Sequence, residues 1–210
     1  MRVQPWHLVH LQGRHQGRRT GSCEAASNGD LNPYGIVFVQ NCRRFFNMVG
    51  AASIALTRTG AKRTRLKELG AAHVIATEEQ DLVAEVERLT GGQGARVVFD
   101  PVGDPTLAKL AAAAARLGII FEYGALSTEP TPLPLFNVLG KWLTIRGYVV
   151  VEITSDPERL NEAKRFILDG LIKRALKPVI ARTFHLLDKI VEANRYLESN
   201  EQIGKIVVTV

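Results

Sequence analysis

The sequence is poor in the residues and segments that mark several classes of protein. It has only two cysteines, Cys23 and Cys42, among 210 residues, and neither lies at a metal-ligand spacing. A disulfide framework is therefore excluded, and a reducing, cytoplasmic compartment fits best. No stretch approaches the roughly 18 consecutive apolar residues of a membrane-spanning helix, so we expect no membrane partner. With 46% hydrophobic and 23% charged residues, the chain has globular proportions.

Acidic residues are scarce at the start of the chain. Residues 1–50 hold six Arg, no Lys, one Glu and one Asp, a net charge of +4, whereas residues 51–210 hold 21 basic and 19 acidic residues, a net charge of +2. The basic head, residues 1–46, has no aromatic interleaving and no recognisable binding fold, so we expect no nucleic-acid partner. Three interpretations of this head remain open: a disordered extension, a start codon that does not belong to the ancestral protein, and an Arg-rich transit peptide.

Most catalytic motifs are also absent. The sequence has no G-x-S-x-G elbow, no P-loop and no H-E-x-x-H motif. None of the four Tyr residues has a Lys four positions later, which removes the tyrosine–lysine dyad of short-chain dehydrogenases. The motif search therefore names no catalytic residue and no metal site.

Short apolar runs alternate with amphipathic segments from residue 54 onward, a pattern typical of a parallel sheet with crossover helices. We expect strands at 54–57, 73–76, 96–100, 118–123 and 143–151, and helices at 62–69, 78–89 and 105–117. Asp156 and Pro157 predict the start of a helix that stops before Gly170, followed by strands at 178–184 and 206–210 around a helix at 187–198. The expected fold class is α/β, a Rossmann-like doubly wound parallel sheet.

Ligands of open parallel sheets bind beyond the carboxyl ends of the strands, so the loops there form the candidate site. The first loop holds Thr57, Arg58 and Lys62, and no carboxylate follows the strand before Glu68. Cationic and hydroxyl groups at this place accommodate the 2′-phosphate of NADP, whereas an acidic residue grips the ribose hydroxyls of NAD. A solvated helix start, in which Arg58 and Lys62 do nothing specific, is the competing interpretation.

Two further loops carry glycine at the ends of neighbouring strands. They consist of Asp100, Pro101, Val102 and Gly103, and of Gly124, Ala125 and Leu126. Glycine lets a backbone approach a flat ring or a phosphate closely, and both loops leave the same edge of the sheet. Asp100 either contacts the ligand or, as a strand-end carboxylate, caps the local backbone.

Six segments in series resemble one family. They are TRTGAKR (57–63), LKELGAAHVI (66–75), LTGGQGARVVFDPVG (89–103), YGALS (123–127), LTIRGY (143–148) and ESNEQIGKIVV (198–208). Over residues 47–210 their order and spacing are similar to those of the medium-chain dehydrogenase/reductase superfamily, in its zinc-independent, quinone-oxidoreductase-like branch.

The resemblance implies an NADP(H)-dependent oxidoreductase that acts on quinones, enones or other activated carbonyl compounds without a metal. Thr57, Arg58 and Lys62 would meet the 2′-phosphate, Asp100 to Gly103 would line the ribose and the nicotinamide approach, and Gly124 to Leu126 would flank the nicotinamide. Asn200 and Lys205 would approach the cofactor from the C-terminal tail. Family members pair across the strand that matches Leu143 to Tyr148, which implies a homodimer.

Two departures from the family pattern concern the front of the chain. Family members carry a GroES-like catalytic domain ahead of the cofactor domain, and residues 1–46 match nothing in it. Residues 47–50 resemble the end of the glycine-rich turn, but residues 51–53 cannot form the crossover of about ten to twelve residues that a parallel strand pair needs. A strand at 36–39 is available, although Arg43 and Arg44 follow where glycines would bind pyrophosphate.

These departures suggest a truncated or rearranged relative with an incomplete first βα unit. We expect a poorly ordered head at 1–46, an NADP-binding domain at 47–170 and, at 171–210, a segment that returns to the catalytic domain. An inactive cofactor-binding module, or a remnant that oligomerises through exposed strand edges, is the alternative to an active reductase.

Overall fold

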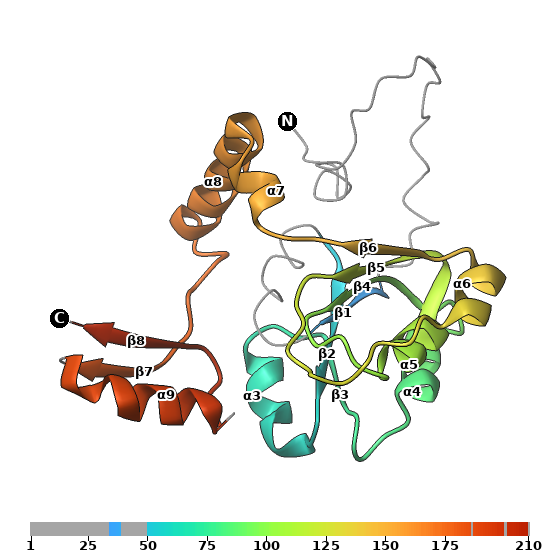
Figure 1. Ribbon diagram of the computed structural model, residues 1–210, viewed down its shortest axis with the longest axis horizontal. Coiled ribbons are helices and arrows are strands. Elements are labelled where there is room, and N and C mark those ends of the chain that lie inside the picture. Colours follow the sequence, from blue (N-terminus) through green and yellow to red (C-terminus); the bar gives the residue numbers. More distant parts are fainter. Residues whose placement is uncertain (1–33, 39–49, 186, 200, 210) are drawn as a thin grey trace. The chain divides into compact units, whose positions relative to one another are not determined.

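The computed structural model describes residues 34–38, 50–185, 187–199 and 201–209 (Figure 1). Two compact units, Met1–Lys164 and Arg165–Val210, divide the chain. The first unit contains a six-stranded sheet in the order β3-β2-β1-β4-β5-β6, in which all neighbours run parallel. Its strands are β1 (Tyr34–Phe38), β2 (Ala52–Thr57), β3 (His73–Ala76), β4 (Ala95–Asp100), β5 (Ala114–Glu122) and β6 (Thr144–Gly147).

The strand order confirms the doubly wound α/β fold. The chain steps outward from β1 through β2 to β3, returns to the other side of β1, and steps outward again from β4 to β6. The direction therefore reverses between β1 and β4, and such a switch point is where open α/β sheets bind their ligands.

The first strand of the sheet along the chain is β1. It pairs with both β2 and β4, which confirms the strand that the sequence offered at 36–39 and places it ahead of the boundary expected at residue 47. Residues 39–51 connect β1 to β2, enough for a parallel crossover. The turn that the sequence indicated at residues 43 and 44 lies outside the described residues.

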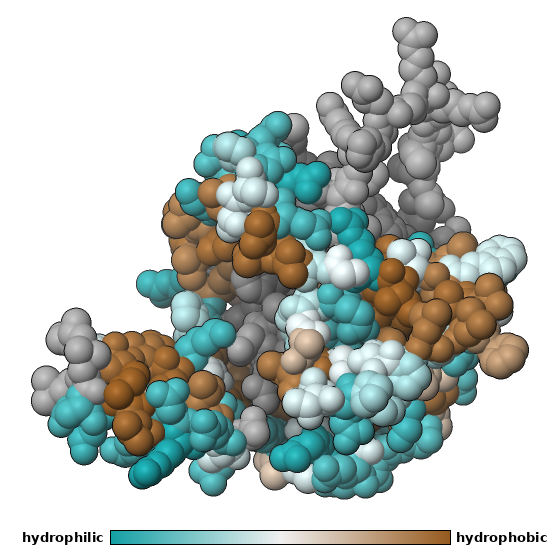
Figure 2. Space-filling view, viewed as in Figure 1, coloured by the Kyte–Doolittle hydropathy of each residue, from teal (hydrophilic) through white to brown (hydrophobic). Residues whose placement is uncertain are grey.

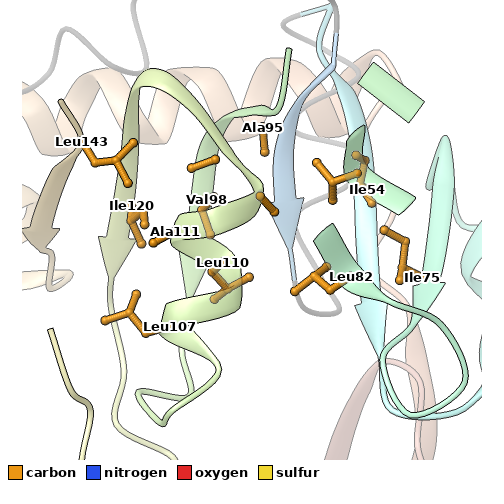
Figure 3. Packing of buried hydrophobic residues seen from close by; sticks show 13 residues of the cluster. Ile54, Ile75, Leu82, Ala95, Val98, Leu107, Leu110, Ala111, Ile120 and Leu143 are labelled. Carbon is orange, nitrogen blue, oxygen red and sulfur yellow. The ribbon is translucent and has the colours of Figure 1, made fainter. Parts of the chain in front are cut away.

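One face of the sheet is covered by α4 (Leu82–Thr90) and α5 (Leu107–Ala113). Figure 3 shows side chains of both helices packed against those of the strands. The buried cluster includes Ile54, Ile75, Leu82, Val86, Val98, Leu107, Leu110, Ala111 and Ile120. The apolar stripe predicted for the second helix is confirmed, since Leu82, Val83, Val86 and Leu89 all belong to this cluster or pack against it.

Several helix boundaries differ from the sequence-based expectation. Helix α4 begins at Leu82, not 78, because the Asp81 carboxylate accepts a hydrogen bond from the Ala84 N–H at 2.8 Å and fixes the N-cap. Helix α5 ends at Ala113, not 117, because Ala114 pairs with Ala95 of β4. Pairing with a remote strand here overrides the high helix propensity of the alanines.

The segment after β5 contains a helix that the sequence analysis missed. Helix α6 (Leu135–Lys141) follows the proline-rich loop, with Pro134 at its N-cap. The strand expected at 143–151 is shorter, since β6 ends at Gly147 opposite Glu122, the last residue of its partner β5. Helix α7 (Val151–Thr154) follows instead. The proline before the apolar run LFNVL was the available signal for α6.

The C-terminal unit begins within α8 (Pro157–Ile172). The Asp156 cap is confirmed, because its Oδ1 accepts from the Glu158 and Arg159 N–H groups. The predicted stop before Gly170 is wrong, since Gly170 is buried inside the helix. Strands β7 (Ile180–His185) and β8 (Lys205–Thr209) pair in parallel around the short 3-10 helix η2 (Leu187–Lys189) and α9 (Ile190–Glu198). Among the described helices none has the length and apolarity needed to cross a membrane.

Candidate cofactor site

The three loops predicted from the sequence all lie at the carboxyl edge of the six-stranded sheet. One follows β2, on one side of the switch point, and the other two follow β4 and β5, on the other side. A dinucleotide laid across this edge would span both halves of the sheet. The parallel arrangement therefore brings together the segments that the sequence singled out.

The loop after β2 is held by the turn after β3. The backbone carbonyls of Thr57 and Arg58 accept hydrogen bonds from the N–H groups of Thr77 at 2.8 Å and Glu78 at 2.9 Å. Arg58 is exposed, and Lys62 is half-buried at the end of the 3-10 helix η1 (Gly60–Lys62), which continues into α3 (Arg63–Glu68). The basic groups therefore stand at the carboxyl edge of the sheet. Whether they bind the 2′-phosphate or belong only to a solvated helix start is decided by titration with the two coenzymes.

Glu79 is a member of this loop cluster that the sequence analysis missed. Its Oε1 accepts a hydrogen bond from the Gly60 N–H at 2.6 Å, and its Oε2 lies 3.8 Å from Nη2 of Arg63. Along the chain, no carboxylate follows β2 before Glu68, but the pairing of β3 with β2 brings the Glu79 carboxylate to this loop. The Gly60 N–H, a donor for an anion, is therefore already engaged by an acidic side chain.

The loops after β4 and β5 continue the pairing of the two strands. The N–H groups of Tyr123, Leu126 and Ser127 donate to the carbonyls of Asp100, Pro101 and Val102 at 3.0, 3.1 and 2.9 Å. Rings on one face of the strands add contacts, with Phe99 stacked on Phe121 at a centroid distance of 5.1 Å. The two glycine-bearing loops therefore form one hydrogen-bonded surface, from which Leu126 projects 78% exposed.

The structure explains why glycine occupies positions 103 and 124 without the approach of a ligand that the sequence analysis predicted. A Cβ added to Gly124 would lie 2.6 Å from the carbonyl oxygen of Pro101, so the contact between the loops excludes a side chain there. Gly103 has φ of +62°, in the left-handed region that L side chains rarely adopt. Close packing of backbone and local conformation account for both residues.

Two acidic residues are buried where these strands end. Asp100 is 4% exposed; its Oδ1 accepts from the Val102 N–H at 2.8 Å, which confirms the backbone-capping interpretation. Its Oδ2 and the Oε1 of Glu122 are buried and have no hydrogen-bond partner among the described residues. Burial raises the pKa of the Asp100 carboxyl, and burial together with the negative charges of Asp100 and Asp104 raises the pKa of Glu122 to about 7.

Two predicted site residues do not belong to these loops. Lys205 is the first residue of β8 in the C-terminal unit, where its N–H donates to the Val179 carbonyl at 2.7 Å. Asn200 lies outside the described residues. Their approach to the cofactor stays a prediction.

The residues present fit a phosphorylated nicotinamide dinucleotide at the sheet edge. The exposed Arg58 offers positive charge after β2, and the hydrogen-bonded loops after β4 and β5 offer backbone groups on the other side of the switch point. No group of three His, Cys, Asp or Glu side chains that could hold a metal ion occurs in the described ranges.

Comparison with known proteins agrees with this architecture. The model of the zinc-binding dehydrogenase family matches residues 40–169. The chain is 28% identical over 166 residues to a 2-haloacrylate reductase of a Burkholderia species, covering 76% of this chain and 48% of that protein. It is 32% identical over 133 residues to quinone oxidoreductase 1 of Escherichia coli K12, covering 60% of this chain and 40% of that protein.

A solved structure shares the fold. It is that of the Escherichia coli quinone oxidoreductase complexed with NADPH, which matches with a TM-score of 0.76 at 24% identity, over 85% of this chain and 57% of that one. The chain spans about half or less of the length of these curated relatives. With the family model covering more than half of its residues, the chain belongs to the zinc-binding dehydrogenase family, within the medium-chain dehydrogenase/reductase superfamily.

Proposed function

We propose that this chain binds NADP(H) at the carboxyl edge of its six-stranded sheet and serves the reduction of a quinone, an enone or a related activated carbonyl compound. The observation that carries the proposal is the joint presence, at one edge, of the basic loop after β2 and the paired loops after β4 and β5. Family membership supports the same chemistry, because relatives include proteins named as quinone oxidoreductase and 2-haloacrylate reductase.

Each loop has a distinct part in this proposal. Arg58 and Lys62 bind the 2′-phosphate through charge-assisted hydrogen bonds, aided by the Thr57 hydroxyl. The backbone of Asp100 to Gly103 lines the ribose side of the pocket, and that of Gly124 to Leu126 flanks the nicotinamide. For the tail residues Asn200 and Lys205, an approach to the cofactor stays a prediction.

When bound, the nicotinamide supplies a hydride, and the protein supplies its orientation. The paired loops after β4 and β5 hold their backbone groups through three interloop hydrogen bonds, so the ring meets a preorganised surface. The aromatic rings of Phe99 and Phe121 support this surface from the sheet.

A titration of the purified chain with NADPH and with NADH, followed by cofactor fluorescence, tests the binding step. We expect NADPH to bind at least tenfold more tightly, since one charge-assisted contact to the 2′-phosphate contributes about 1.5 to 3 kcal/mol. Equal and weak binding of both coenzymes, at millimolar concentrations, would refute the proposal.

Turnover separates the reductase from the second candidate, a non-catalytic cofactor-binding module. The relevant observation is that the chain spans 48% and 40% of two relatives whose names describe a reductase and an oxidoreductase, so activity cannot be carried over with the fold. NADPH oxidation in the presence of menadione supports the reductase. Tight NADPH binding with no oxidation above the rate without protein supports the module.

We also propose a homodimer formed through the edge of β6. The outer edge of this strand has no partner in the described part of the chain. Beside it, Figure 2 shows a hydrophobic patch over α6, where Phe136 is 90%, Leu139 62% and Trp142 57% exposed. Pairing of two β6 edges would extend the sheet and cover these side chains. A cytoplasmic location stays a prediction from the low cysteine content.

A further inference from the structure

The last residues of β4 and β5 are both acidic and stand opposite each other. Asp100 and Glu122 are register partners in the parallel pair, so their side chains point to the same face of the sheet. That face is the one covered by helices, because Val98 and Ile120, two residues earlier on each strand, are fully buried in the core cluster (Figure 3). Two carboxyl groups therefore meet at the end of an apolar core.

Each of the two carboxyl groups has one oxygen that nothing in the described chain satisfies. Oδ2 of Asp100, in a side chain 4% exposed, and Oε1 of Glu122 are both buried without a donor. Buried polar atoms normally have a hydrogen-bond partner. Two carboxylates cannot satisfy each other, but a carboxylic acid donates its O–H to a neighbouring carboxylate. One proton removes both deficits.

We propose that Asp100 and Glu122 share one proton, and that this acid–carboxylate pair is a positioning element that holds the two glycine-bearing loops in the shape that receives the nicotinamide. The first half of the proposal concerns the free protein, and the second half rests on the proposed function. The pair adjoins the hydrogen bonds between the loops, since the Asp100 carbonyl accepts a hydrogen bond from the N–H of Tyr123, the residue after Glu122.

The surrounding charged groups favour retention of the proton. Asp104, in the loop before α5, adds a negative charge that acts on both carboxyl groups. The basic residue of β6 is Arg146. It pairs with Glu152 at 2.8 Å and stands in register with Phe121, so its side chain points to the opposite face. The Tyr148 hydroxyl titrates far above neutrality, since burial and Glu152 raise its pKa.

The ionisation behaviour of the two groups agrees with this geometry. Burial raises the pKa of Glu122 to about 7 and also raises that of Asp100, against the lowering effect of the backbone N–H groups of Val102 and Gly103. Below neutrality the pair holds its proton. Above it, two like charges oppose each other across the register and push apart the loops that Leu126 and Ser127 connect to Pro101 and Val102.

The first test uses the free protein. The thermal midpoint is measured from pH 5 to pH 9 for the wild type, Glu122→Gln and the control Glu129→Gln. The control changes an exposed carboxyl and leaves the backbone N–H of Glu129, which donates to the Ser127 Oγ, in place. A carboxyl with a raised pKa in the folded state stabilises the fold at low pH, and this contribution is lost as the pH rises from about 4.5 to 7. The wild-type midpoint should therefore fall relative to that of Glu122→Gln by several degrees over this range.

Glu129→Gln should follow the wild type at every pH. Parallel curves for the wild type and Glu122→Gln would overturn the shared proton. If Glu122→Gln fails to fold, the wild type alone decides through its infrared spectrum, in which a protonated carboxyl band should persist at pH 6 and disappear by pH 9. A spectrum without that band at pH 6 would equally overturn it.

The second test concerns the cofactor. Glu122→Gln lacks the shared proton, so its pH dependence of NADPH binding gives the contribution of the 2′-phosphate ionisation alone. Relative to Glu122→Gln, the dissociation constant for NADPH should rise at least threefold between pH 6 and pH 8.5 in the wild type and in Glu129→Gln. Equal pH dependence in the wild type and Glu122→Gln overturns the positioning role. Absence of NADPH binding at either pH refutes the proposed function, and with it the positioning role, while the midpoint experiment still decides the shared proton.

Discussion

Replacement of Gly124 by alanine is the sharpest test of the paired loops. The new methyl carbon would lie 2.6 Å from the carbonyl oxygen of Pro101, at least 0.4 Å inside the 3.0 Å that such contacts respect (3.0 − 2.6). The same carbonyl accepts the hydrogen bond from the Leu126 N–H at 3.1 Å, so relief of the clash strains that bond. Overpacking of this kind costs about 1 to 3 kcal/mol, and we expect a loss of about 2 kcal/mol in the free energy of unfolding.

The measurement is urea-induced unfolding followed by circular dichroism, with Gly140→Ala as control. A Cβ at Gly140, within α6, meets no atom within 4 Å, so this variant should be as stable as the wild type or up to about 1 kcal/mol more stable. The NADPH dissociation constant should rise only in Gly124→Ala. Identical unfolding midpoints for the two variants would refute the inference that loop contact, and not ligand approach, requires the glycine.

Three further outcomes are expected. Arg58→Ala should weaken NADPH binding about tenfold and leave NADH binding nearly unchanged, because only NADPH loses a charge-assisted bond to its 2′-phosphate. The control Lys109→Ala removes the same charge on the exposed side of α5 and should affect the binding of neither coenzyme. Glu79→Gln should strengthen NADPH binding severalfold in the same titration. The substitution removes the negative charge of the carboxylate that accepts the hydrogen bond from the Gly60 N–H at 2.6 Å. An unchanged affinity would mean that the phosphate binds elsewhere. Phe136→Ser should weaken a dimer at least tenfold in analytical ultracentrifugation, because a 90% exposed ring that becomes buried contributes about 2 kcal/mol, whereas Leu197→Ser in the C-terminal unit should not.

The sequence alone determined the alternation of elements and the place of the candidate loops. The strand at 73–76, the Asp156 cap and the apolar stripe of α4 depend on neighbouring residues and on periodicity, so they could be predicted from the chain itself. The glycine-bearing loops followed from the same reasoning, because parallel strands end at one edge.

Only the tertiary structure decided which strands lie side by side and in which register. That arrangement ends α5 at Ala113, brings the Glu79 carboxylate onto Gly60, and sets Glu122 opposite Asp100. Each of these pairs joins residues 19 to 22 positions apart, beyond the reach of local propensity and short-range periodicity. Register is a property of the assembled sheet, and the chemistry of the loops after β2, β4 and β5 depends on it.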